Sequence, residues 1–134
     1  MGLTGVIIRC SIQLKKVESG WIKQQTVVNN NLNETLQSFY EHKKATYSVA
    51  WIDCLAKGKS FGRSILMLGE HAQKSEVEAK PANYPKRKNK KITFPFDAPS
   101  FLLNNFTVSA FNKLYFNLNK NKQSFYMDWD TYFY

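Results

Sequence analysis

The chain has 134 residues, of which 43% are hydrophobic and 15% aromatic, so its length and composition suit one folded domain and exclude a disordered tail. No apolar run approaches the roughly 20 residues that a membrane-spanning helix needs, which excludes a transmembrane helix. The net charge of +9 raises the question of an anionic partner, and the answer depends on where the basic residues lie.

The first predicted element is a strand over residues 5–14, where apolar and polar residues alternate. This period of two predicts that one side of the strand packs on a core, the side formed by Val6, Ile8, Cys10, Ile12 and Leu14. Because a domain rarely begins inside such an element, we expect the chain to be a fragment of a longer protein.

A second strand is predicted over residues 21–28, and a short amphipathic helix follows it, reaching to about residue 44. Asn31 or Asn33 is suited to cap this helix, because an asparagine side chain accepts hydrogen bonds from the free amides of the first turn. The helix is predicted from one apolar stripe, formed by Leu32, Leu36, Phe39 and Tyr40.

Two strands over residues 47–55 and 63–69 are predicted to pair as an antiparallel hairpin, because a short connection with a glycine at residues 57–59 joins them. The alternation places Trp51 and Asp53 on the same side of the first strand. A lone acid in this position is expected to be a hydrogen-bonded structural group rather than a general base.

Much of the positive charge lies in one segment, residues 79–92, which contains two prolines and few apolar residues and is predicted to be an exposed basic loop. Its basic residues are Lys80, Lys86, Arg87, Lys88, Lys90 and Lys91. The alternative is a small nucleic-acid or anion-binding module that uses this loop. A nucleic acid is not the expected partner, because the aromatic residues follow core-like patterns rather than neighbouring these lysines.

Residues 108–118 carry apolar side chains at helical spacing and predict an amphipathic helix. The last ten residues are rich in aromatic side chains, which the chain itself is not expected to cover: Phe125, Tyr126, Trp129, Tyr132, Phe133 and Tyr134. This is a second reason to expect a fragment. It also leaves open an interaction domain that dimerises through these aromatic residues.

The sequence offers little catalytic chemistry of its own. His42 and His71 are the only histidines, and neither has a metal-ligand spacing, so no metal site is expected. Cys10 and Cys54 form no zinc or redox motif, which favours a reducing, cytoplasmic compartment. We therefore expect no catalytic residues in this chain.

Four stretches in this order and spacing resemble FAD-linked oxidases of the vanillyl-alcohol-oxidase type, especially the decaprenylphosphoryl-ribose oxidase branch: GLTGVII at 2–8, YSVAWID at 47–53, FGRS at 61–64 and NKLY at 112–115. The resemblance implies an α+β fold, with an antiparallel sheet and a few helices. Residues 1–17 would be the last strand of the FAD-binding domain. Residues 18–134 would be the N-terminal part of the substrate, or cap, domain.

The resemblance also implies candidate site residues. Those beside the FAD dinucleotide are Gly2, Thr4, Gly5, Val6 and Ile7, and the glycines fit this role because they permit close backbone approach to a cofactor. Val49 and Trp51 are the candidates for the substrate pocket. The ribose oxidase branch carries a small hydroxyl residue at the position of Val49, so this chain lacks a hydrogen-bond donor there.

By the same resemblance, the whole protein is expected to oxidise an alcohol carbon of a sugar-like substrate by hydride transfer to flavin. The chain alone is expected to be inactive and to hold no FAD, because the main FAD-binding region and the catalytic segment of the family lie outside it. Its partners would be the substrate and the remainder of its own protein. A cytoplasmic location is expected, with association of the whole protein with a membrane face as an alternative.

Overall fold

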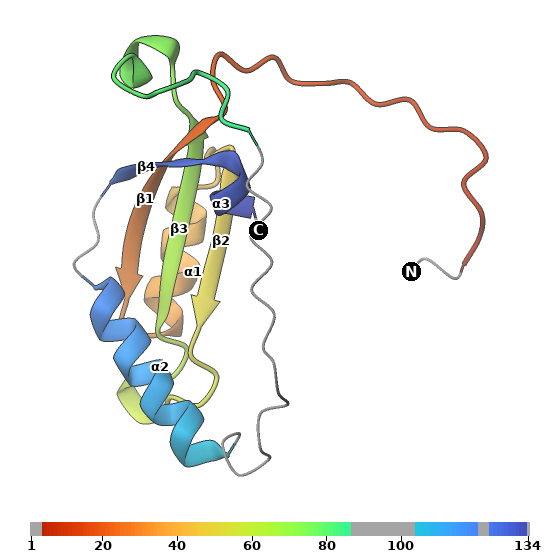
Figure 1. Cartoon of the computed structure of the whole chain (residues 1–134). Coiled ribbons are helices and arrows are strands. Elements are labelled where there is room, and N and C mark those ends of the chain that lie inside the picture. The colour runs from red at the N-terminus through yellow and green to blue at the C-terminus, as the bar shows by residue number, and fades with distance from the viewer. Residues whose placement is uncertain (1–3, 87–103, 121–123, 134) are drawn as a thin grey trace, which may run out of the picture.

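The computed structural model describes residues 4–86, 104–120 and 124–133. Its centre is a four-stranded antiparallel sheet with the strand order β2-β3-β1-β4 (Figure 1). The strands are β1 (Trp21–Asn29), β2 (Tyr47–Ile52), β3 (Ser64–His71) and β4 (Phe125–Asp128). The predicted strand at residues 21–28 and the predicted antiparallel hairpin of β2 and β3 are both confirmed.

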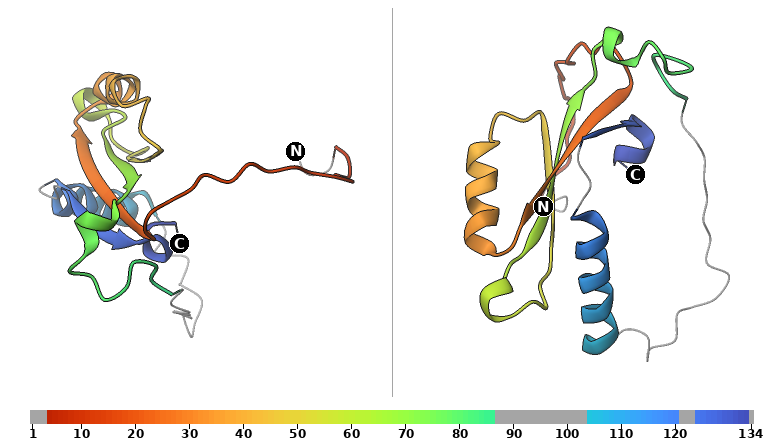
Figure 2. Two further views of the ribbon diagram at one scale, coloured as in Figure 1. Left: turned by 90° about the horizontal axis from the view of Figure 1, so that it is seen from above. Right: turned by 90° about the vertical axis from the view of Figure 1, so that its left-hand side faces the viewer.

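Helices cover both faces of this sheet. The α1 helix (Leu32–Glu41) lies on one face, and α2 (Asn105–Asn119) and the short α3 (Trp129–Phe133) lie on the other (Figure 2). The α+β class is thereby confirmed. None of the described helices is long and apolar enough to cross a membrane. The apolar side chains buried in the described residues are Ile22, Ile65, Leu66, Leu68, Ala72, Val77 and Phe116.

The α1 helix begins where the sequence predicts, but it buries a different side. Asn31 is the N-cap, and its side-chain oxygen accepts a hydrogen bond from the amide of Glu34. The residues that α1 buries are Thr35 and Ser38, whose hydroxyls join a polar network with strand residues beneath them. The stripe that predicted the helix is largely exposed, and the helix ends at residue 41 rather than near 44.

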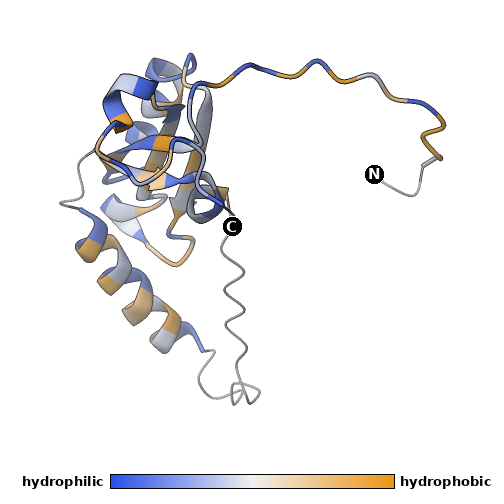
Figure 3. Ribbon diagram, turned by 45° about the horizontal axis from the view of Figure 1, so that its top comes forward, coloured by the Kyte–Doolittle hydropathy of each residue, from blue (hydrophilic) through white to orange (hydrophobic). Residues whose placement is uncertain are grey.

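The α2 helix confirms the prediction over residues 108–118, again with an unexpected orientation. Phe111, Leu114 and Leu118 are exposed, and Phe116 is the residue that α2 buries. Figure 3 shows apolar residues recurring along the visible length of this helix. Three of the apolar side chains that predicted this helix therefore stay in solvent, whereas Tyr115 contacts Trp51 of the sheet.

The prediction that residues 5–14 form a core-facing strand is wrong. The segment runs extended away from the sheet (Figure 1), forms no strand, and leaves its apolar side in solvent, with Ile8 at 96% exposure. A strand needs a partner edge and an apolar surface, and this segment pairs with neither edge of the described sheet. Its proposed place in an FAD-binding domain stays a prediction.

The described C-terminal aromatic residues are covered better than the sequence suggests. Tyr132 packs over Gly69 of β3, and the indole nitrogen of Trp129 donates a hydrogen bond to the carbonyl of Pro85 at 3.0 Å. Phe133 remains 46% exposed but contacts the ring of Tyr47. The expectation that the chain leaves these rings uncovered is therefore wrong for Trp129 and Tyr132 but holds for Phe133, and Tyr134 lies outside the described residues.

Candidate functional site

The two predicted substrate-binding residues lie on the sheet face that carries α2 and α3. They occupy alternate positions of β2, so their side chains share this face. Val49 is 52% exposed, and the ring of Trp51 packs against Tyr115 of α2, with 4.8 Å between the ring centroids. The side chain of Val49 is thus accessible to solvent, while Tyr115 of α2 packs against the ring of Trp51.

A buried polar cluster lies beside Trp51, centred on Asp53. This carboxylate is 2% exposed. Its Oδ2 accepts hydrogen bonds from Nε and Nη2 of Arg63 at 2.9 and 2.7 Å. Its Oδ1 accepts from Nδ2 of Asn112 at 2.7 Å and from the amide of Leu55 at 3.1 Å. The hydrogen bonding expected of this acid is confirmed.

This cluster joins three of the stretches that carry the family resemblance. Asp53 closes the stretch at 47–53, Arg63 lies in 61–64, and Asn112 opens 112–115. Arg63 lies 10 positions from Asp53 and Asn112 lies 59 positions from it, and the hydrogen bonds bring all three to one point at the end of β2. Sequence reasoning singled out Asp53 alone, and the signal for the other two lay only in those stretches.

Stability should fall at acid pH as this cluster protonates. Burial raises the pKa of Asp53, but hydrogen bonds from Arg63, Asn112 and the amide of Leu55 outweigh it and hold that pKa below its ordinary value. A carboxyl with a lowered pKa stabilises the fold above its unfolded-state pKa, and the contribution is lost as pH falls through the folded-state value. Urea unfolding between about pH 6 and 2 should show this loss, and Asp53→Asn should show a flatter pH profile.

Aromatic residues form the other end of the same face. The hydroxyl of Tyr47 lies 3.0 Å from Nε2 of His71, whose Nδ1 faces the carbonyl of Ser19 at 3.3 Å. The rings of Tyr132 and Phe133 from α3 contact Tyr47. Gly69 permits this packing, because the hydroxyl of Tyr132 occupies the space that a side chain at this position would fill.

Removing the hydroxyl of Tyr132 should leave the fold unchanged or stabilise it by up to about 1 kcal/mol. That hydroxyl is buried without a hydrogen-bond partner among the described residues. Burial is the main cause that raises the pKa of Tyr132, and the nearby Tyr47 and Glu70 raise it further. Tyr47→Phe is the matched control, because it breaks the hydrogen bond to His71 and should cost about 1 kcal/mol. Thermal unfolding of both variants measures the difference, and a larger loss in Tyr132→Phe would contradict this view.

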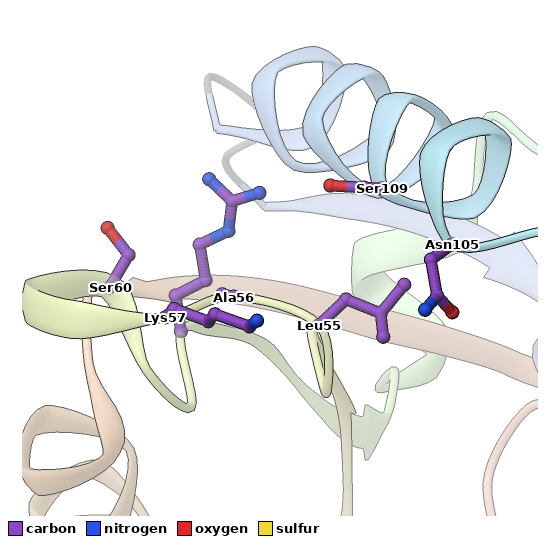
Figure 4. A pocket seen from close by; sticks show the side chains of 7 residues that line it. Leu55, Ala56, Lys57, Ser60, Asn105 and Ser109 are labelled. Atoms are coloured by element: carbon purple, nitrogen blue, oxygen red, sulfur yellow. The ribbon is translucent and has the colours of Figure 1, made fainter.

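A pocket of about 430 Å³ adjoins the Asp53 cluster at Arg63, between the β2–β3 connection and the start of α2 (Figure 4). Two apolar residues of that connection contribute to its lining. Its polar and charged lining residues are Lys57, Ser60, Arg63, Asn105 and Ser109. Sequence reasoning missed this pocket, because it forms only where two distant segments meet.

The structure does not bring the FAD candidates to the substrate candidates. Thr4, Gly5, Val6 and Ile7 lie in the extended N-terminal segment, which Figure 1 shows leading away from the sheet, and Gly2 lies outside the described residues. The described chain leaves open space around the Cα of Gly5. The described residues thus leave the backbone at Gly5 unobstructed and build no enclosed site around it.

The described residues hold no group of three or more His, Cys, Asp or Glu side chains that would suit a metal ion. Both histidines instead make hydrogen bonds within the fold, His42 with the carbonyl of Ser38 at 2.9 Å and His71 with Tyr47. The basic loop is described only as far as residue 86. There Lys80 lies over the ring of Trp21, 4.9 Å from its centroid, so one aromatic residue does neighbour this segment.

No protein-family model matches the chain. Among curated proteins, it is 29% identical over 119 residues to decaprenylphosphoryl-β-D-ribose oxidase of Mycolicibacterium smegmatis, a match that covers 86% of this chain and 26% of that protein. It is 25% identical over 104 residues to an uncharacterized protein in the mprA 5' region of Streptomyces coelicolor, covering 77% of this chain and 28% of that protein. The chain thus spans about a quarter of the length of these relatives.

These matches support the resemblance in its coarser form. Most of this chain is similar to one part of an oxidase, and the likeness is distant.

Proposed function

We propose that this chain is part of an FAD-dependent oxidoreductase. In this proposal residues 1–17 belong to the FAD-binding domain as its last strand, and residues 18–134 form the N-terminal part of the substrate domain. The observation that supports it best is the meeting of three resembling stretches at Asp53, beside Trp51. The similarity to an oxidase over 119 residues supports the same assignment.

The substrate would lie against the sheet face at Val49 and Trp51. Val49 offers an exposed apolar surface there, and the indole of Trp51, held by Tyr115, offers a rigid aromatic wall. Such a wall excludes water from one side of a sugar-like alcohol and fixes its orientation. Asp53 and Arg63 act as positioning residues, because their ion pair fixes the end of the hairpin that carries Trp51.

The cofactor would lie along the N-terminal segment. Gly2, Thr4, Gly5, Val6 and Ile7 would contact the dinucleotide through their backbone, and FAD, when bound, would accept the hydride. The exposed apolar side of residues 5–14 would pack against the rest of the FAD-binding domain. This accounts for an amphipathic segment that finds no partner among the described residues.

Two substitutions in the whole protein should separate these roles. Trp51→Ala should lower the rate of flavin reduction by an alcohol substrate by about tenfold to a hundredfold without changing the flavin content. Gly5→Val should lower the flavin content, because a branched side chain obstructs the backbone. Flavin absorbance per protein and stopped-flow reduction measure the two effects.

The control is Phe106→Ala, which truncates a ring of α2 that is 82% exposed and lies outside the proposed contacts, and it should change neither quantity. Whole protein purified without any flavin and unable to bind added FAD would refute the proposal. The isolated 134-residue chain should not bind FAD tightly, and micromolar binding with a bound-flavin spectrum would overturn the view that it supplies a single wall.

A further inference from the structure

The β2 strand lies at one edge of the sheet (Figure 1), and the described residues leave its outer side without a partner strand. Hydrogen bonds between antiparallel strands alternate along each strand. The amide of Asp53 donates to the carbonyl of Arg63 at 3.0 Å, in the register that continues the strand pairing of β2 with β3. The odd-numbered residues of β2 therefore bond to β3. The backbone N–H and C=O groups that point outward belong to Ser48, Ala50 and Ile52.

This edge lacks the features that keep exposed strands apart. Natural edge strands are typically very short or carry charges, prolines or bulges. The six residues of β2 include no charge and no proline, and their pairing with β3 is continuous. The opposite edge strand, β4, has four residues and runs directly into α3. In the described sheet, β2 is therefore the edge that is open to a further strand.

A second copy of β2 fits this edge. Two identical strands can pair antiparallel about a two-fold axis, which is the commonest symmetry of homodimers. Residues opposite each other then lie on the same face of the sheet, and β2 carries no charge that would face its like. Val49 and Ile52 are 52% and 42% exposed, and they lie on opposite faces. Pairing would remove part of both side chains from water.

We propose that β2 is a self-association edge, at which two copies of this chain pair antiparallel and join two four-stranded sheets into one. The outward groups of Ser48, Ala50 and Ile52 would form the new hydrogen bonds in each copy. The pairing would also extend the face at Val49 and Trp51 into the partner copy. The proposal stands on the geometry of this edge and not on the proposed oxidoreductase function.

Hydrogen exchange tests the pairing at the amides concerned. The 134-residue chain with its charge of +9 is studied at rising concentration and at about 0.15 M ionic strength, which screens repulsion between copies. We expect sedimentation to show a monomer–dimer equilibrium. As the dimer forms, amide exchange followed by NMR should slow at Ser48, Ala50 and Ile52. The amides of Val49 and Trp51 should change little, because β3 already protects them.

Ser48→Lys and Gln25→Lys are the matched variants. Both residues are exposed, and both pair with Leu68 of β3, from opposite sides. Each variant therefore adds one charge to the same row and face of the sheet, on the edge strand β2 or on the interior strand β1. Ser48→Lys should weaken the dimer about tenfold, because an edge lysine opposes strand addition and each dimer contains two. Gln25→Lys should weaken it less than about twofold.

Ile8→Lys is a second control, because it changes the exposed apolar side of the N-terminal segment and should leave the dimer intact. Circular dichroism checks that each variant keeps its fold. If Ile8→Lys weakened the dimer as much as Ser48→Lys, the interface would lie on that segment and the proposal would be overturned. A chain that stays monomeric at about 1 mM, or equal losses in Ser48→Lys and Gln25→Lys, would overturn it as well. So would a dimer in which the three outward amides exchange as fast as in the monomer.

Discussion

Replacing Asp53 by alanine is expected to lower the free energy of unfolding by about 3 kcal/mol or more, because the partly buried guanidinium of Arg63 would lose its carboxylate. The substitution also removes the acceptor of the hydrogen bonds from Asn112 and the amide of Leu55. These contacts tie α2 to the end of the β2–β3 hairpin. Urea unfolding followed by circular dichroism measures the loss.

Two further variants show whether the unpaired charge causes this loss. Adding Arg63→Met to Asp53→Ala should recover much of the stability, because a buried ion pair replaced by apolar side chains is often tolerated. Glu76→Gln breaks the more exposed ion pair with Lys23 and should have a much smaller effect. If Asp53→Ala alone cost less than about 1 kcal/mol, the cluster would not be what holds α2 on the sheet.

Local patterns predicted the elements of this fold well. The alternation around Trp51 and the glycine at residue 58 predicted the hairpin, and Asn31 caps α1 as its residue type suggests. Both features depend on neighbours within a few residues, which is the range over which periodicity and capping carry information. The alternation at residues 5–14 is just as regular, but a strand also needs a partner edge, which periodicity does not supply.

These local patterns did not predict which side of each helix is buried. Hydrophobicity alone favoured the apolar stripe of α1 as its buried side, whereas Thr35 and Ser38 are buried because Asn29 and Ser64 satisfy their hydroxyls. Burying a hydroxyl costs little when it is hydrogen-bonded. Such pairing depends on residues from three elements, so it is visible only once the sheet and helix are placed together.

The candidate site shows the same limit. Trp51 and Asp53 were placed on one side of their strand correctly, but the partner of Asp53 on α2, Asn112, is 59 positions away. The pocket at Lys57 likewise needs Ser109 from the same helix. Sequence periodicity finds the strand that carries a site, and tertiary structure decides which groups complete it.

Substituting Gly62 by alanine is expected to destabilise the chain by about 1 kcal/mol or more beyond the same change at Gly58. Both glycines have positive φ angles, +70° at Gly62 and +60° at Gly58, so each alanine incurs the roughly 1–2 kcal/mol cost of a left-handed conformation.

Only Gly62 is also crowded. A Cβ at Gly62 would lie 2.7 Å from the Cβ of Leu32, whereas one at Gly58 would meet nothing within 4 Å. Leu32 is held in place because its amide donates to the carbonyl of Phe61 at 2.9 Å, so relief of the clash requires the start of α1 to move. Urea unfolding of the two single variants measures the difference, since the backbone cost is common to both. Equal losses would mean that α1 shifts freely on the sheet, contrary to the close packing that Gly62 permits.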